Sequence, residues 1–169
     1  MELKDTIRAI KDYPKEGVIF RDITTLLKDK DAFKEAVDEM AEKIDDDVDK
    51  IVGIEARGFI FASALAYKLD KGFVPVRKPG KLPWDKERES YELEYGEDSI
   101  EIHKDALEPG EKVVIVDDLL ATGGTAKASV NLVEKLKGEV SSMIFLVELE
   151  DLKGREVLSG TRVESIIKY

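Results

Sequence analysis

The sequence predicts an α/β domain with a mostly parallel β-sheet flanked by helices. Short apolar runs rich in β-branched residues alternate along the chain with segments of helical periodicity, the order expected of βαβ units. One run, residues 113–116, ends in two aspartates and a glycine-rich turn. Ligands of open parallel sheets bind at the carboxyl ends of the strands, where such residues gather. No internal repeat or linker divides the chain, so we expect one domain over residues 1–169.

The N-terminal part predicts two helices separated by an extended segment. Leu3, Ile7 and Ile10 recur at helical spacing and indicate a short first helix. Residues 18–23 form an extended apolar stretch that ends in charge. Asp31 is positioned to cap a second helix.

Strand and helix units follow an acidic run at residues 45–49, which we interpret as a solvated turn rather than a metal site. Residues 51–54 and 72–77 predict buried strands, and the alanine-rich residues 59–69 predict the helix between them. Residues 78–89 contain prolines, a glycine and a run of charges, which indicates a long mobile loop.

The second half of the chain predicts an arm and the rest of the sheet. Residues 91–95 and 100–103 alternate in character and suit a β-hairpin across residues 96–98. The remaining predicted elements are a helix after Thr125 that Gly138 caps, a buried strand at residues 143–147, a short helix or turn at residues 152–158 and a closing strand at residues 163–167.

Composition limits the possible partners. The chain carries 37 acidic against 27 basic residues, a net charge of −10, which argues against general nucleic-acid binding. It has no cysteine, so a reducing compartment is permitted. The start of the sequence does not resemble a signal peptide, and no apolar run approaches membrane length. We therefore expect a cytoplasmic protein without a membrane or nucleic-acid partner.

The strand and turn at residues 113–125 carry the clearest chemistry. Asp117 and Asp118 can accept hydrogen bonds from hydroxyls or hold a hard cation such as Mg²⁺. A glycine-rich turn that enters a helix presents backbone N–H groups and a positive dipole end to a phosphate. The turn consists of Ala121, Thr122, Gly123, Gly124 and Thr125. The P-loop and dinucleotide spacings are both missing, so a ribose 5-phosphate suits the pattern better, with an ordinary solvated turn as the alternative.

Basic residues near two other strand ends could bind the rest of such a ligand. Arg57 matches a pyrophosphate oxygen pair, but a structural ion pair with Glu55 is equally compatible with the spacing. Arg77, Lys78 and Lys81 add positive charge to the expected loop. They are candidate ligands of the same anion, and the alternative is a solvated loop.

Several blocks of sequence resemble the adenine phosphoribosyltransferases, a type I phosphoribosyltransferase family. The blocks are Tyr13-Pro14 with residues 17–24 (GVIFRDIT), residues 53–59 (GIEARGF), 77–83 (RKPGKLP), 93–96 (LEYG), 101–105 (EIHKD), 113–125 (VVIVDDLLATGGT) and 152–156 (LKGRE). The match runs through nearly the whole chain. Residues 84–90 (WDKERES) carry no signature of the family.

The resemblance implies a type I phosphoribosyltransferase-like fold with a flexible β-hairpin arm and an N-terminal hood. It implies transfer of the 5-phosphoribosyl group of 5-phosphoribosyl-1-pyrophosphate (PRPP) to adenine, giving AMP and pyrophosphate. Residues 121–125 would hold the 5-phosphate, and Asp117 and Asp118 the ribose hydroxyls. Arg57 would lie in the pyrophosphate loop. Mg²⁺ would arrive with PRPP rather than on a metal site of the protein.

The family also implies roles for the base-binding segments and a homodimer. The hood residues Ile19, Phe20 and Arg21 would bind adenine, with Phe20 stacking on the base opposite Leu119. Glu94 in the arm would accept the proton from adenine. In a homodimer, Arg77 would reach the pyrophosphate of the partner's site. His103 is expected to pack in the arm, and Tyr95 is compatible with either packing or catalysis.

Two other functions compete with this one. A phosphoribosyltransferase for a 6-oxopurine is disfavoured because residues 143–147 contain no lysine to recognise a 6-oxo group. A PRPP-sensing regulator would be expected to carry a DNA-binding module, for which the chain has neither spare length nor a basic patch.

Overall fold

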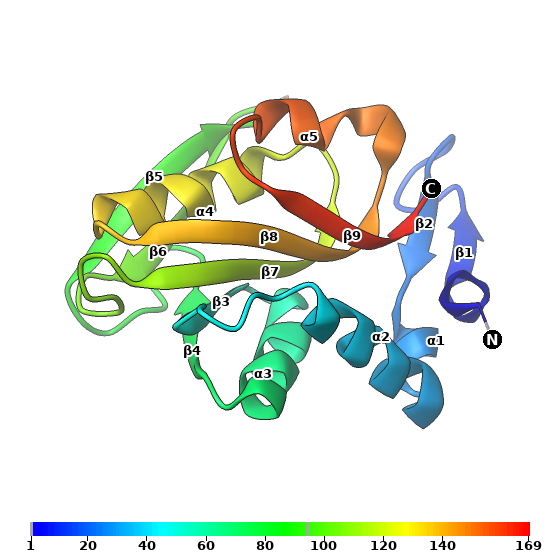
Figure 1. The fold of residues 1–169 in the computed structure, drawn as a ribbon. Helices are drawn as coiled ribbons and strands as arrows, with labels where there is room; N and C mark the ends of the chain where they lie inside the picture. The colour runs from blue at the N-terminus through cyan, green and yellow to red at the C-terminus, as the bar shows by residue number, and fades with distance from the viewer. Residues whose placement is uncertain (1, 94) are drawn as a thin grey trace. The chain divides into compact units, whose positions relative to one another are not determined.

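The computed structural model describes residues 2–93 and 95–169, and it divides into two compact units, residues 1–39 and 40–169. Each unit has its own secondary structure (Figure 1). The expectation of a single domain over residues 1–169 stays a prediction. No helix in the described part of the chain is both long and apolar enough to cross a membrane.

The first unit is built on a two-stranded antiparallel hairpin. Its elements are η1 (Leu3–Thr6), β1 (Arg8–Lys11), β2 (Ile19–Asp22), α1 (Thr24–Leu27) and most of α2 (Lys30–Glu42). The expected extended stretch at residues 18–23 is confirmed as β2. The expected first helix is wrong beyond Thr6, because the chain becomes extended there and Arg8 pairs with Asp22 across the hairpin. Pairing with a neighbouring strand overrides the local helical spacing.

The residue that caps α2 lies two positions earlier than the sequence suggests. The carboxylate of Asp29 accepts hydrogen bonds from the backbone N–H groups of Asp31 (3.0 Å) and Ala32 (3.1 Å). Asp29 is therefore the capping residue, and the expectation of Asp31 is wrong. Asp31 lies in the first turn, where a negative charge interacts favourably with the helix dipole.

The second unit contains a five-stranded sheet in which every neighbouring pair is parallel, as expected. The strand order is β4-β3-β7-β8-β9. The strands are β3 (Lys50–Ile54), β4 (Gly72–Val76), β7 (Lys112–Leu120), β8 (Glu139–Glu148) and β9 (Val163–Lys168). The chain passes outward from β3 to β4 and then continues on the other side of β3 with β7. The order of the chain thus reverses between β3 and β7.

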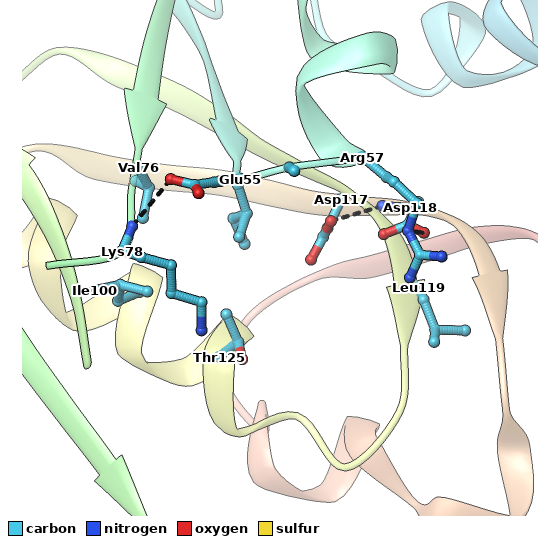
Figure 2. A pocket seen from close by; sticks show the side chains of 11 residues that line it. Glu55, Arg57, Val76, Lys78, Ile100, Asp117, Asp118, Leu119 and Thr125 are labelled. Atoms are coloured by element: carbon cyan, nitrogen blue, oxygen red, sulfur yellow. Dashed lines mark hydrogen bonds and ion pairs between the residues drawn. The ribbon is translucent and has the colours of Figure 1, made fainter. Parts of the chain in front are cut away.

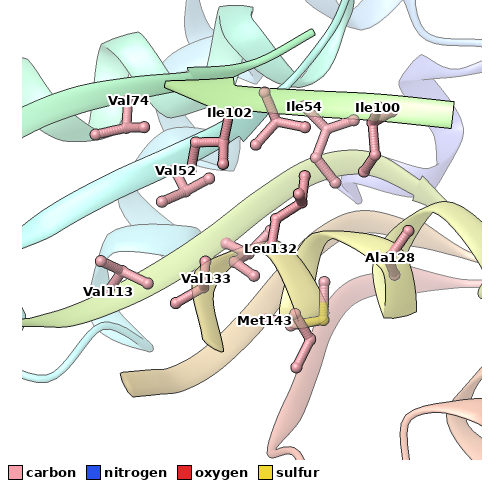
Figure 3. Packing of buried hydrophobic residues seen from close by; sticks show 14 of the residues in the cluster. Val52, Ile54, Val74, Ile100, Ile102, Val113, Ala128, Leu132, Val133 and Met143 are labelled. Carbon is pink, nitrogen blue, oxygen red and sulfur yellow. The ribbon is translucent and has the colours of Figure 1, made fainter. Parts of the chain in front are cut away.

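Helices cover both faces of this sheet (Figure 1). Helix α3 (Gly58–Leu69) contacts β3 and β7 on one face, and α4 (Gly124–Lys135) contacts β7 and β8 on the other. Side chains alternate between the faces of a strand, so the apolar runs of β3 and β7 supply both cores. Figure 3 shows the cluster on the α4 side, which includes Val52, Val113, Leu132 and Met143.

A second hairpin, formed by β5 (Lys86–Glu92) and β6 (Glu97–His103), is the expected arm and packs along α4. It is longer than predicted, because β5 begins at Lys86 and takes up the charged residues assigned to a mobile loop. Along β5 the exposed and half-buried side chains alternate, which a strand accommodates without an apolar run. Arg77 and Glu101 exchange backbone hydrogen bonds of 3.0 and 2.8 Å, which join the end of β4 to β6.

The C-terminal end of α4 has a Schellman motif. Lys137 has a φ of 65° and donates its N–H to the carbonyl of Glu134 (2.9 Å), and Gly138 donates to the carbonyl of Val133 (3.0 Å). The left-handed residue is therefore Lys137, and the expectation that Gly138 is the cap is wrong by one position. A Cβ at Gly138 would lie 2.9 Å from Leu107 Cδ1 and 3.0 Å from Val133 Cγ1, so a larger residue there would require these side chains to shift.

The last segment holds two short elements, η2 (Glu150–Leu152) and α5 (Gly154–Val157), in agreement with the expected short helix or turn. Arg155 of α5 donates from Nε to both carboxylate oxygens of Glu148, at 3.0 and 2.9 Å. Glu148 is buried at the end of β8, where Ser165 also donates to it (2.7 Å). This charged network fixes α5 against the ends of β8 and β9.

Candidate active site

The main cavity of the second unit lies at the point where the strand order reverses. In open α/β sheets such a point leaves a crevice outside the carboxyl ends of the strands, where ligands bind. The cavity here measures about 210 Å³ and lies at the ends of β3, β4 and β7 (Figure 2). Its lining residues are Ile54, Glu55, Ala56, Arg57, Val76, Lys78, Ile100, Asp117, Asp118, Leu119 and Thr125.

Asp117 and Asp118 lie within β7 rather than after it. The strand continues to Leu120, because it stays paired with β8 as far as Leu120 and Glu148. Asp118 is only 6% exposed, and its carboxylate Oδ2 lies 2.9 Å from Nε of Arg57. The backbone N–H of Asp118 donates to Oδ1 of Asp117 (2.8 Å). Burial raises the pKa of Asp117 well above its ordinary value, and the neighbouring Asp118 carboxylate raises it further.

Gly58 allows helix α3 to begin directly beside Asp117. A Cβ at Gly58 would lie 2.7 Å from Asp117 Oδ1 and 3.0 Å from the carbonyl oxygen of Val116. Any side chain would therefore separate α3 from β7 at Asp117. Gly58, the first residue of α3, thus allows the helix to approach this aspartate closely.

The structure pairs Arg57 with a different carboxylate from the one considered. Its guanidinium forms an ion pair with Asp118, which also lines the cavity, rather than with Glu55, and the expected pyrophosphate contact of Arg57 stays a prediction. The Arg57 side chain is 45% exposed at the rim, where a ligand can reach it. The peptide bond between Glu55 and Ala56, just before Arg57, is cis.

Glu55 binds the basic loop instead. It accepts hydrogen bonds from Nε of Arg77 (3.0 Å) and from the backbone N–H of Lys78 (3.1 Å), and it forms an ion pair with Lys81. Burial alone would raise the pKa of Glu55, but the hydrogen bonds from Lys81, Lys78 and Arg77 outweigh it and hold the pKa below its ordinary value. Glu55 therefore contacts all three basic residues, although the Lys81 side chain remains 47% exposed, and their expected role as PRPP ligands stays a prediction.

Of these three, Lys78 extends into the cavity (Figure 2). Its ammonium group forms an ion pair with Asp98 of β6 and lies 3.3 Å from the hydroxyl of Tyr91. Burial lowers the pKa of Lys78, but the hydrogen bonds to Asp98 and Tyr91 prevail and leave it above the ordinary value. Lys78 is thus a fixed positive charge at the wall of the cavity.

A second, smaller cavity of about 90 Å³ adjoins the first at Asp117, Leu119 and Thr125. It is lined by the whole expected phosphate turn, Ala121, Thr122, Gly123, Gly124 and Thr125. Gly123 has a φ of 92°, a conformation that favours glycine, and helix α4 begins at the next residue. A helix N-terminus of this kind attracts an anion through its unpaired N–H groups and its dipole.

Helix α5 supports the turn from the side away from the cavity. A Cβ at Gly123 would lie 2.9 Å from the carbonyl oxygen of Gly154, and one at Gly154 would lie 2.6 Å from the carbonyl oxygen of Ala121. The two backbones touch because neither residue has a side chain. The Arg155–Glu148 network therefore fixes the position of the phosphate turn.

Comparison with known proteins agrees with this geometry. The family model of the phosphoribosyl transferase domain matches residues 24–167. The chain is 58% identical to the adenine phosphoribosyltransferase of Ruminiclostridium cellulolyticum and 59% identical to that of Halothermothrix orenii, with at least 99% of each chain covered. The chain belongs to the adenine phosphoribosyltransferase family.

Crystal structures of this family superpose closely on the chain. The adenine phosphoribosyltransferase of Thermoanaerobacter pseudethanolicus is 55% identical, with a TM-score of 0.96 over 99% of this chain and 98% of that one. The enzyme of Saccharomyces cerevisiae, complexed with adenine and an imino-altritol bisphosphate, is 40% identical, with a TM-score of 0.90 over 98% and 96%. The predicted fold and family are confirmed.

The expected base-binding residues of this phosphoribosyltransferase are placed in two different units. Ile19, Phe20 and Arg21 lie on β2 of the first unit, where the Phe20 ring packs edge-on against Tyr13 at 5.2 Å. Leu119 lies on β7 and lines both cavities. Glu94 falls outside the described residues, so its expected role stays a prediction.

Tyr95 and His103, the two arm residues considered for either packing or catalysis, differ in their surroundings. Tyr95 is 87% exposed. His103 ends β6 and accepts a long hydrogen bond of 3.4 Å from the backbone N–H of Trp84, so it packs in the arm as expected.

Three residues near the phosphoribosyltransferase site had no role in the sequence analysis. They are Tyr91, Asp98 and Gly154. Tyr91 and Asp98 reach the site only because the arm folds onto α4, which no local spacing reveals. Gly154 belongs to the block at residues 152–156 that resembles the family, and this resemblance was the one feature of the sequence that could have pointed to its role.

Proposed function

We propose that this enzyme transfers the 5-phosphoribosyl group from PRPP to adenine, releasing pyrophosphate and AMP. The observation that carries the proposal is the pair of adjoining cavities at the strand reversal, one lined by Asp117 and Asp118 and the other by the phosphate turn. A ribose 5-phosphate needs both kinds of site next to each other, and the two cavities share Asp117, Leu119 and Thr125. Residues 121–125 bind the 5-phosphate, and the aspartates accept hydrogen bonds from the ribose hydroxyls.

The remaining charges would neutralise the leaving pyrophosphate. Arg57 is exposed at the rim of the cavity and presents a planar fork of donors. Lys78 adds a fixed positive charge, and we propose Lys81 as a further PRPP ligand of this site and Arg77 as a PRPP ligand of the partner's site. Displacement at the anomeric carbon has an oxocarbenium-like transition state, so stabilising the departing anion lowers the barrier.

Mg²⁺ fits this site as a companion of PRPP. The described residues contain no group of three or more His, Cys, Asp or Glu side chains that could hold a metal ion. Mg²⁺ commonly binds through one or two carboxylates together with substrate phosphates, and Asp117 and Asp118 provide such oxygens. Bound in this way, the ion would supply positive charge to the pyrophosphate.

The base-binding roles that the family resemblance implies are proposed as follows. We propose that Phe20 stacks on the base opposite Leu119 and that backbone groups of Ile19 and Arg21 pair with its edge. The 6-amino group donates and the adjacent ring nitrogen accepts. A 6-oxo base reverses both roles and leaves buried groups unpaired, so it is rejected more strongly than by size alone.

We further propose that Glu94 accepts the proton that adenine loses on attack. The arm would close over bound PRPP and exclude water, which would otherwise hydrolyse it. A homodimer in the cytoplasm completes the proposal. The α3–β4 side carries exposed apolar residues, among them Tyr67 (92% exposed) and Phe73, which suits a contact between subunits, with Arg77 reaching the partner's site.

One assay tests the reaction against both competing functions. Pyrophosphate release from PRPP and Mg²⁺ is measured with adenine, hypoxanthine and guanine in turn, with chelation of Mg²⁺ as a control. We expect efficient release with adenine alone and loss of activity on chelation. Comparable efficiency with hypoxanthine would refute the proposed hood contacts, and binding of PRPP without release for any base would indicate a sensor.

A further inference from the structure

Tyr91 of the arm lies directly against the phosphate turn. Its ring covers Gly124, since a Cβ there would lie 3.3 Å from Tyr91 Cδ2. Its hydroxyl oxygen accepts a hydrogen bond of 3.0 Å from Oγ1 of Thr125, the last residue of the turn. The arm therefore touches the turn at both its backbone and its hydroxyl.

The same Tyr91 hydroxyl also joins the turn to the charged wall of the main cavity. It lies 3.3 Å from Nζ of Lys78 and 3.3 Å from Oδ2 of Asp98. Lys78 and Asp98 form an ion pair with each other, and the backbone N–H of Ser99 donates to Asp98 as well (2.8 Å). The result is a continuous path from Thr125 through Tyr91 to Lys78 and Asp98. Thr125 and Lys78, which this path connects, both line the main cavity (Figure 2).

The proton arrangement of this path can adapt to an anion on the turn. A threonine hydroxyl has one proton to donate and can also accept. When a phosphate accepts a hydrogen bond from the Thr125 hydroxyl, the Tyr91 hydroxyl can rotate away from Asp98 and donate a hydrogen bond to the oxygen of Thr125. Asp98 keeps its bonds to Lys78 and Ser99, so no buried group loses its last partner. The contacts persist with or without the anion, and only the direction of donation changes.

We propose that Tyr91 is a positioning residue for the 5-phosphate of PRPP. It holds the Thr125 hydroxyl in the orientation that donates to the phosphate, and it transmits the charge of Lys78 to that hydrogen bond. Its ring keeps Gly124 covered, so that the N–H groups of the turn face the ligand. The inference rests on the proposed binding of the 5-phosphate by residues 121–125, and it adds a residue of the arm to that site.

A double-mutant cycle with ribose 5-phosphate as the ligand tests this role. Dissociation constants are measured by calorimetry for the wild type, Tyr91→Phe, Thr125→Val and the double variant. Tyr91→Phe keeps the ring over Gly124 and removes only the hydroxyl. We expect it to weaken binding about three- to tenfold, the range for one hydrogen bond. In the Thr125→Val background the same change should have less than a twofold effect, because the two hydroxyls act as one unit.

Steady-state kinetics and a second variant separate positioning from general support of the arm. Tyr91→Phe should raise KM for PRPP with KM for adenine and kcat changed less than twofold. Lys135→Met removes the contacts of α4 with the backbone of Arg88 (2.8 Å) and with Glu89 (3.2 Å), which also hold the arm but do not touch the Tyr91 hydroxyl. It should leave the affinity for ribose 5-phosphate unchanged.

Each failure has a distinct meaning. If Thr125→Val weakens binding but Tyr91→Phe does not, the positioning role is refuted while the phosphate turn stands. If the fold-changes in dissociation constant of the two single variants multiply in the double variant, Tyr91 does not act through Thr125 and the inference is wrong. The same conclusion follows if Lys135→Met weakens the binding of ribose 5-phosphate as much as Tyr91→Phe does. If Thr125→Val binds ribose 5-phosphate as tightly as the wild type, both the proposed phosphate site and this inference fail.

Discussion

Replacing Gly154 by alanine should disturb the phosphate turn without touching any ligand. The added Cβ would lie 2.6 Å from the carbonyl oxygen of Ala121, and 2.8 and 2.9 Å from Cδ1 and Cγ of Leu120. An ordinary contact needs about 3.4 Å, so the backbones must separate by about 0.8 Å. Because Arg155 fixes α5 to the buried Glu148, the turn has to absorb much of this shift.

The expected cost follows from overpacking. Inserting a methyl group into a filled site costs about 1–3 kcal/mol, and the better helix propensity of alanine returns about 1 kcal/mol at most. We expect the free energy of unfolding to fall by about 1–2 kcal/mol, or about 2–8 °C in Tm for a chain of this size. A displacement approaching 1 Å at a positioning element can cost about a hundredfold in rate. We therefore expect kcat/KM for PRPP to fall about ten- to a hundredfold.

Thermal unfolding and steady-state kinetics with varied PRPP measure both effects. Gly72→Ala is the matched control, because the nearest atom to its added Cβ is Lys50 Cγ at 3.7 Å, an ordinary contact. It should be as stable and as active as the wild type. Wild-type kcat/KM for PRPP in Gly154→Ala would show that the turn tolerates the shift, and the reasoning about its support by α5 would be wrong.

Three further variants and probes test other parts of the structure. The pKa of Asp22 is lowered from 3.8 to about 2, mainly by hydrogen bonds from Thr24 and then from Arg8, so its stabilisation of about 2 kcal/mol is present above pH 4 and is lost as the pH falls toward 2. Denaturant titrations at pH 7 and pH 3 should show this loss in the wild type and a smaller one in Asp22→Asn. Lys137→Gly should raise the free energy of unfolding by about 0.5–1 kcal/mol, since it relieves a left-handed backbone, and an unchanged denaturation midpoint would contradict this. Trp84 is 65% exposed, so closure of the arm over PRPP and Mg²⁺ should shift its fluorescence and slow its quenching by acrylamide, with pyrophosphate alone doing less; an unresponsive Trp84 would argue against closure of this segment.

The parallel sheet could be predicted because each of its strands is marked by a short run of apolar residues in the sequence. The apolar run at residues 113–116 needs burial on both faces, which only a central strand of such a sheet provides. The polar residues that follow then had to lie at the ligand edge. The end of the strand could not be predicted, since Asp117 and Asp118 have low strand propensity and are kept in β7 by pairing with β8.

The charge pattern of the site depended on contacts between distant segments. Glu55 has two basic neighbours in space, Arg77 and Lys81, that lie more than twenty residues away in sequence. Arg57 instead forms an ion pair with Asp118, which lies far from it in the sequence. Spacing cannot rank such pairs, because the choice depends on the register of β3, β4 and β7. The same applies to the contact between Tyr91 and Thr125.

The buried aspartate pair leads to a prediction in which activity and stability change in opposite directions. Burial and the charge of Asp118 raise the pKa of Asp117, so its ionised form is disfavoured in the folded state. A raised carboxyl pKa means that the folded state binds more protons than the unfolded state, and stability falls as the pH rises through that interval. At pH 7 the wild type is therefore less stable than it would be if Asp117 kept its ordinary pKa.

Asp117→Asn removes this charge and keeps an oxygen to accept the N–H of Asp118, a bond of 2.8 Å in the wild type. We expect the variant to be more stable than the wild type at pH 7, because the penalty for ionising Asp117 in the folded state is removed. The difference should shrink toward pH 4, which thermal unfolding across this range would measure. Turnover should fall about ten- to a hundredfold, because a charge-assisted bond to a ribose hydroxyl is lost. A variant less stable than the wild type at pH 7, or equally active, would show that the charge of Asp117 is not held at a cost for binding the ribose.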